Sequence, residues 1–106
     1  GAHPYSKMLD TASLAIVACA RPEDQKGAVS GYWPLDCGAA VENLLLQAVD
    51  LGYGACWCGC WPNPRLSAIQ EILNTQSVPV AIIAVGVPDE EPRARGFYQP
   101  DRVTWL

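Results

Sequence analysis

The sequence predicts a layered α/β sheet that forms one domain or a piece of one. Residues 12–20 and residues 78–87 are apolar at successive positions, so a strand formed by either run would be buried on both faces. Between these runs, residues 35–52 form a long apolar segment with the period of a helix. Strands that helices bracket in this way are typical of a sheet covered by helices.

The charge balance and the apolar pattern exclude several classes of protein. The chain has 106 residues, half of them hydrophobic, which is enough for one modest core. Eleven acidic residues against seven basic ones leave no positive field for nucleic acid, and no apolar run is long enough to span a membrane. We therefore expect a soluble protein with neither a nucleic-acid nor a membrane partner.

The start of the chain and the cysteine count favour a cytoplasmic location. Residues 1–4 lack the basic and apolar regions of a secretory signal. The five cysteines are an odd number, in a chain that can form a core without disulfides. We therefore predict a reducing, cytoplasmic environment.

The predicted central helix has an unusually wide apolar face. Asp36 is suited to cap its start and Gly52 to follow its end. Its polar residues share one arc of about 140°; they are Glu42, Asn43, Gln47 and Asp50. Because the rest of the circumference is apolar, this helix is expected to be central in the core or to pack on a partner subunit as well.

The remaining segments are shorter. Residues 21–34 are rich in charge, Gly and Pro and predict a surface loop, whose Tyr32 and Trp33 either fold back onto the domain or form a substrate lid. Pro79 is tolerable only near the start of its strand. The other expected elements are a short helix within residues 4–11, a strand at residues 55–58, a helix capped by Asn63 with Pro64 in its first turn and ending at Asn74, and a strand-like segment at residues 102–105.

Three cysteines alternate in the sequence, at Cys56, Cys58 and Cys60. A thiol-metal module is one interpretation, although this spacing suits chelation poorly and no second pair of ligands accompanies it. A nucleophilic cysteine would need a base, and the sole histidine is His3, near the chain end. Small buried hydrophobic side chains are the third interpretation.

The main chain around these cysteines suggests a different kind of site. Glycines at positions 52, 54 and 59 allow another group to approach the backbone closely, and Trp57 can supply a flat apolar wall. Both features suit a planar cofactor. A tight turn between helix and strand explains the same residues equally well.

Arg93 and Arg95 form the second candidate binding feature. On an extended segment they project to the same side, and two converging guanidinium groups can bind a phosphate. Three acidic residues directly precede them, at Asp89, Glu90 and Glu91. A solvated tail of mixed charge is therefore the alternative.

Several segments, taken in order, resemble the nitroreductase family of flavin enzymes. These segments are LDCGAAVENLLLQAVDLGYGACWCGCWPNP at residues 35–64, VGVPDEEP at residues 85–92, the following R-x-R, and RVTW at residues 102–105. The resemblance covers residues 4–106. It implies an α+β flavoprotein with helices on both faces of a layered sheet, which binds FMN at the interface of an obligate homodimer.

The resemblance also implies the roles of individual residues. The backbone at Cys58 and Gly59 would lie beside the isoalloxazine ring, Trp57 would line the ring pocket, and Arg93 and Arg95 would bind the FMN phosphate. Residues 1–87 would be the C-terminal portion of the FMN-binding domain. Residues 88–106 would be an extended tail that packs on the partner subunit.

The activity that the resemblance implies is reduction of an electron-poor small molecule, such as a nitroaromatic or a quinone, by NAD(P)H. The family's Arg-rich phosphate-binding segment and its Pro-Ser-x-x-Asn flavin segment are both absent from this sequence. We therefore expect the chain to be a fragment equivalent to the C-terminal half, or somewhat more, of a family member. A non-catalytic domain that dimerises without a cofactor is the alternative.

Overall fold

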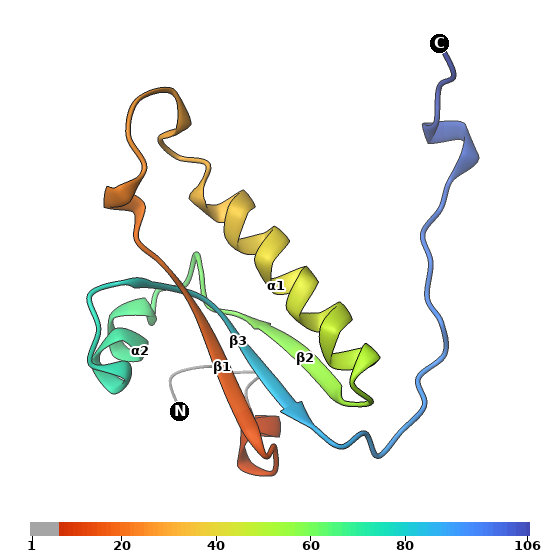
Figure 1. The fold of residues 1–106 in the computed structure, drawn as a ribbon, viewed down its shortest axis with the longest axis horizontal. Helices are drawn as coiled ribbons and strands as arrows, with labels where there is room; N and C mark the ends of the chain where they lie inside the picture. Colours follow the sequence, from red (N-terminus) through yellow and green to blue (C-terminus); the bar gives the residue numbers. More distant parts are fainter. Residues whose placement is uncertain (1–6) are drawn as a thin grey trace.

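The structure is a computed structural model that describes residues 7–106, and its centre is a three-stranded antiparallel sheet (Figure 1). Strand β3 (Val78–Gly86) lies in the middle, between β1 (Leu14–Ala20) and β2 (Gly54–Gly59). Both pairings are antiparallel. The α/β class expected from strand burial is therefore wrong, and the α+β class implied by the family resemblance is confirmed.

Two helices cover opposite faces of the sheet. Helix α1 (Trp33–Asp50) contributes Val41 to a core that includes Ile83 of β3, whereas helix α2 (Leu66–Leu73) contributes Ile69 to a core that includes Ile82. Consecutive residues of a strand point to opposite faces, so Ile82 belongs to one core and Ile83 to the other. This arrangement confirms the expected layered sheet with a helix on each face.

Strand burial differs between the centre and the edges of the sheet. Six consecutive residues of β3 are buried, as its uniformly apolar sequence predicts. Strand β1 is only partly covered within the described residues, and Leu14 is 53% exposed. The expectation that both apolar runs are buried on both faces is thus right for β3 and only partly right for β1. Val17 packs on one core and Ile16 on the other, but the start of this edge strand stays exposed.

Helix α1 begins three residues before the predicted cap. Its first residue is Trp33, and Pro34 occupies the first turn, where its fixed φ and missing N–H are tolerated. Asp36 therefore lies within the first turn and accepts a hydrogen bond from Gln25 Nε2 at 2.6 Å. The helix ends as predicted, since Gly52 adopts a φ of 84° and the Tyr53 N–H donates to the Ala48 carbonyl at 2.8 Å.

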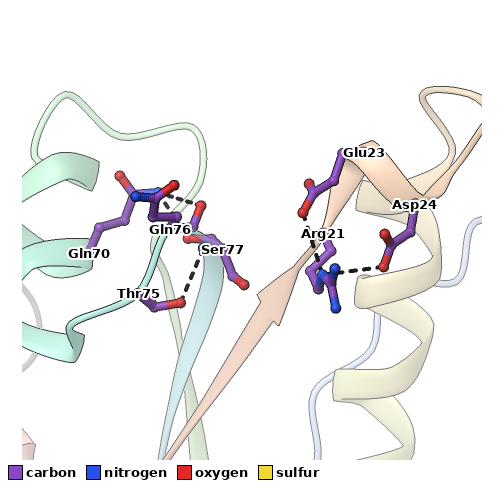
Figure 2. A network of polar contacts seen from close by, with 7 residues as sticks. All are labelled: Arg21, Glu23, Asp24, Gln70, Thr75, Gln76 and Ser77. Atoms are coloured by element: carbon purple, nitrogen blue, oxygen red, sulfur yellow. Dashed lines mark hydrogen bonds and ion pairs between the residues drawn. The ribbon is translucent and has the colours of Figure 1, made fainter.

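Helix α2 starts later than predicted and ends where predicted. Asn63 organises the turn before the helix, because its Oδ1 accepts a hydrogen bond from the Arg65 N–H at 2.7 Å. At the other end Asn74 is left-handed, with a φ of 50°. Figure 2 shows how Gln70 then ties the helix to the chain entering β3, donating through Nε2 to the Ser77 carbonyl at 2.9 Å.

The proline in the central strand is accommodated by an irregularity in the sheet. Pro79, the second residue of β3, pairs with Cys19, and the register of β1 against β3 shifts between Ala18 and Cys19. The carbonyl of the next residue, Val80, accepts hydrogen bonds from the N–H groups of Cys60 at 2.8 Å and Trp61 at 3.3 Å. Pro79 therefore lies near the start of its strand, as the sequence predicts.

The segments outside the sheet and helices are short turns or extended chain. Residues 21–32 form most of the loop predicted at residues 21–34, with two 3-10 turns, η2 (Pro22–Asp24) and η3 (Gly27–Val29). Within the described residues, the expected N-terminal helix is the turn η1 (Lys7–Asp10). The strand expected at residues 102–105 is wrong; that region contains the turn η4 (Pro100–Arg102) and extended chain.

Residues 87–106 extend away from the sheet and expose nearly all of their side chains (Figure 1). Among them are large apolar groups that a folded chain normally covers; these are Val87, Phe97, Tyr98, Trp105 and Leu106. Across residues 7–106, the helices are too short or too polar to cross a bilayer.

Candidate functional site

Strand β2 places the indole of Trp57 and the thiol of Cys58 on opposite faces of the sheet. Trp57 pairs with Ile83 on the face covered by α1, whereas Cys58 pairs with Ile82 on the face covered by α2. The Cη2 atom of Trp57 lies 3.9 Å from the position that a Cβ would take at Gly38 of α1. The glycine thus leaves room for the indole, which remains 40% exposed.

Neither Cys58 nor Gly59 offers a side chain to a ligand at the end of β2. The Cys58 side chain is 4% exposed, in the core beside Ile69, and its Sγ lies 4.0 Å from Met8 Sδ. Gly59 is exposed, and among the described residues a Cβ there would meet no atom within 4 Å beyond its two chain neighbours. A ligand at this end of β2 would therefore meet the main chain rather than a side chain.

Strand β2 lies at an edge of the described sheet. Within residues 7–106, no strand lies on the side of β2 away from β3. Alternate N–H groups of an edge strand point away from its neighbour and can donate hydrogen bonds to another molecule. The indole of Trp57 lies on this edge strand. The residues predicted to contact the flavin, Trp57, Cys58 and Gly59, are thus the last three residues of β2.

The structure does not bring Arg93 and Arg95 to that edge within one chain. Both residues lie exposed on the C-terminal segment, which leaves the sheet after Gly86. Gly86 pairs with Gly54, at the end of β2 opposite Gly59, and Figure 1 shows the segment running away from the sheet. Among the described residues neither arginine forms an ion pair, so the two lie apart from the end of β2 on an extended tail.

The alternating cysteines differ strongly in environment. Cys56 is exposed, whereas Cys60 is fully buried and Cys58 nearly so. Burial is the main cause that raises the pKa of both the Cys58 and the Cys60 thiol, and a neighbouring thiol raises each further. These two thiols are therefore protonated at neutral pH and pack as small hydrophobic groups.

The other chemistry suggested by the cysteines has no support in the described part of the chain. No group of three His, Cys, Asp or Glu side chains among residues 7–106 is placed to hold a metal ion. His3, the base that a nucleophilic cysteine would have needed, lies outside the described residues.

Sequence reasoning missed one aromatic contact at this corner of the molecule. Trp33, the first residue of α1, meets Trp61 edge to face, with ring centroids 4.8 Å apart and an interplanar angle of 68°. Trp33 thus folds back onto the domain, and the lid interpretation of this residue is wrong. The sequence carries no local signal for this contact, because the two residues lie 28 positions apart.

The antiparallel sheet with one helix on each face defines a layered α+β domain. The sequence model of the nitroreductase family matches residues 2–87. This chain belongs to the nitroreductase family.

Two curated relatives come from archaea. Proteins provisionally named NADH dehydrogenase/NAD(P)H nitroreductase from Methanothermobacter thermautotrophicus and Archaeoglobus fulgidus are 36% identical over 104 residues and 38% identical over 103 residues. The alignments cover 95% and 94% of this chain but 53% and 57% of the relatives. The chain thus spans about half the length of the curated relatives that it matches.

Solved structures show the same fold. A crystal structure of a protein from Parabacteroides distasonis, again provisionally named NADH dehydrogenase/NAD(P)H nitroreductase, has a TM-score of 0.88 and 31% identity, covering 98% of this chain and 61% of that one. An FMN-dependent nitroreductase from Clostridium difficile has a TM-score of 0.77 and 28% identity, covering 89% and 57%.

Proposed function

We propose that this chain is part of an FMN-dependent oxidoreductase that uses NAD(P)H to reduce an electron-poor small molecule, such as a nitroaromatic or a quinone. Membership of the nitroreductase family and the names of its relatives support this proposal. The observation that carries it is the half-exposed indole of Trp57 on β2, an edge strand of the described sheet, against Gly38 of α1.

The residues at this edge suit a flavin ring. The exposed part of Trp57 can pack against a planar apolar surface, and the family resemblance implies that the main chain at Cys58 and Gly59 lies beside the ring. The space beside Gly59 would be reduced by any larger side chain. When bound, FMN supplies the electron-transfer chemistry, and the protein supplies position and charge.

The overall reaction balances without an acid or base from the described residues. For a nitro group, NAD(P)H plus one proton and the nitro compound give NAD(P)⁺, the nitroso compound and water. The buried thiols of Cys58 and Cys60 take no part, because burial raises their pKa and keeps them protonated. The chain's contribution is to hold the reacting partners in place.

A homodimer would complete the site. The outer side of α1 exposes a row of apolar residues, with Leu35, Leu46 and Val49 each at least 60% exposed. The C-terminal segment exposes apolar groups too, among them Phe97 and Trp105. A second copy packed on these surfaces would bury both, and its tail would carry Arg93 and Arg95 to the flavin phosphate of the opposite subunit.

The cytoplasm would suit this protein. All five cysteines are free, and two of them lie in the core as thiols. A reducing compartment preserves that state.

The proposal is tested by reconstituting the full-length protein with FMN, removing free cofactor and recording the absorbance spectrum. We expect a bound flavin whose absorbance is bleached by NADH or NADPH without oxygen and restored by a nitroaromatic. A folded dimer that retains no flavin would contradict the proposal. That result would support a non-catalytic dimerising domain in its place.

A further inference from the structure

We propose that Met8, Cys56 and Cys58 form a three-sulfur site that binds a soft monovalent metal ion, Cu⁺. The two cysteines lie on the face of the sheet that α2 covers, whereas Trp57 lies on the face that α1 covers. The inference does not rest on the function proposed above, because neither the site nor its test involves a flavin.

Strand geometry places Cys56 and Cys58 on the same side of β2. They pair with Ala84 and Ile82, which are alternate residues of β3, and Ile82 belongs to the core beneath α2. The two thiols also interact. After burial, the Cys56 thiol is the next cause that raises the pKa of Cys58, in part through a hydrogen bond. Two sulfur atoms on one face of the strand are thus within reach of each other.

The turn η1 supplies the third sulfur. Met8 Sδ lies 4.0 Å from Cys58 Sγ, although the two residues are 50 positions apart in the sequence. The Met8 carbonyl accepts hydrogen bonds from the N–H groups of Thr11 at 3.3 Å and Ala12 at 3.0 Å. The next residue, Leu9, packs against the core beneath α2. These contacts hold the thioether beside the strand.

The spacing of the sulfurs suits binding of one metal ion by three ligands. Three sulfur atoms in a plane, each about 2.3 Å from a central metal ion, lie about 4.0 Å from one another. The observed separation of Met8 Sδ and Cys58 Sγ is 4.0 Å. Cys60 does not belong to this set, because its fully buried thiol donates to the Cys58 carbonyl at 3.8 Å.

A cleft of about 500 Å³ gives solvent access to the site. Met8 and Cys56 both line the cleft and are both exposed, whereas Cys58 contacts Met8 from within the core. Among the described residues that line the cleft, Glu90 alone is charged, and its carboxylate favours entry of a cation. Two of the three sulfurs are therefore accessible rather than packed in the core.

The donor set selects the class of metal. Thiolate and thioether sulfur are soft ligands that favour Cu⁺ over hard ions such as Mg²⁺ and Ca²⁺. Structural Zn²⁺ takes four ligands from Cys, His and carboxylate groups, and no three such groups gather to hold a metal ion among residues 7–106. Binding displaces both thiol protons: Cu⁺, two thiols and the thioether give a three-coordinate complex with two thiolates and release two H⁺.

The test measures transfer of Cu⁺ from its coloured bicinchoninate complex to the full-length protein, as purified and without oxygen. We expect the wild type to withdraw about one Cu⁺ per chain. Cys56→Ala, which alters an exposed side chain, should weaken Cu⁺ binding by about a hundredfold. Met8→Leu, which keeps an apolar side chain but removes the thioether, should weaken it by about tenfold.

Cys19→Ala is the matched control. Cys19 is another exposed thiol on an edge strand, but it pairs with Pro79 near the start of β3 and lines a different cleft. We expect this variant to bind Cu⁺ as tightly as the wild type does. Far-UV circular dichroism of each variant verifies that the fold is retained.

Three results would overturn the inference. One is wild-type affinity for Cu⁺ in Cys56→Ala, and another is an equal loss in Cys56→Ala and Cys19→Ala, which would assign binding to scattered surface thiols. The third is wild-type affinity in Met8→Leu, which would remove the thioether from the site. Flavin retention is measured separately, so this inference and the proposed function fail independently.

Discussion

The buried thiols of Cys58 and Cys60, in the core beneath α2, should lower the stability of the folded protein at high pH. Burial raises the pKa of both thiols above the ordinary value of 9.0. An acid whose pKa is higher in the folded state holds its proton longer there than in the unfolded chain. Its stabilising contribution is therefore complete below the ordinary pKa and is lost as the pH rises toward the folded-state value.

We expect the free energy of unfolding to fall between neutral pH and a pH of about 9.5. Urea unfolding at several pH values measures this slope. In the double variant Cys58→Ala and Cys60→Ala the slope should be shallower. An identical slope in the variant and the wild type would show that other groups cause the decline.

Gly38 offers a stabilising substitution next to the candidate site. A Cβ at this position would lie 3.9 Å from Trp57 Cη2, which is an ordinary van der Waals contact. Because glycine weakens a helix interior, Gly38→Ala should raise the free energy of unfolding by about 0.5–1 kcal/mol. Urea denaturation measures this gain, and Gly38→Leu, whose larger side chain would displace Trp57, should lose it.

At the scale of the element, the end of α2 depends on one left-handed residue. Asn74 has a φ of 50°, which asparagine tolerates better than most residues and glycine best of all. We expect Asn74→Ala to lower the free energy of unfolding by about 1 kcal/mol and Asn74→Gly to be neutral or stabilising. Equal effects of both substitutions in urea unfolding would contradict this account.

Helix ends were predictable where a residue has a special backbone conformation. Gly52 and Asn74 both end helices in left-handed conformations that few other residues adopt readily. Helix starts were less predictable, because Pro34 permits α1 to begin before Asp36, and Asn63 shapes a turn rather than the first helical residue. Several chemically similar starts compete, and tertiary contacts decide among them.

Strands were predictable only where the chain itself supplies the partner. The apolar run of β3 identified the central strand, whose neighbours are both present. Residues 102–105 have the composition of a strand, yet they pair with nothing in the described chain. Composition indicates which segments can pair, but a ladder of hydrogen bonds also needs a second strand.

The candidate site, too, was predictable from the sequence only in part. The sequence places Trp57 and Gly59 two positions apart, and alternate residues of a strand lie on the same face. The contact between Trp33 and Trp61 depends on how a helix and a turn 28 positions apart pack together, which local patterns do not specify. The distance of Arg93 and Arg95 from β2 likewise became evident only from the path of the tail.

At the scale of the whole molecule, the exposed tail and the open edge of β2 are two halves of one proposed site in different subunits. Replacing Arg93 and Arg95 by alanine should weaken FMN binding, with each lost charge-assisted hydrogen bond worth about 1–3 kcal/mol. Gly59→Leu should weaken binding at the other half, because the added side chain would occupy the place proposed for the flavin ring. Flavin retained after gel filtration measures both losses.

Mixed dimers of these two variants separate the trans arrangement from a cis one. If the arginines reach the partner, a dimer of one Arg93→Ala/Arg95→Ala subunit and one Gly59→Leu subunit has one site with both defects and one with neither. Such heterodimers, isolated through two affinity tags, should therefore bind about half as much FMN as the wild-type dimer. If the arginines served their own subunit, both sites would carry one defect each and the mixed dimer would recover nothing.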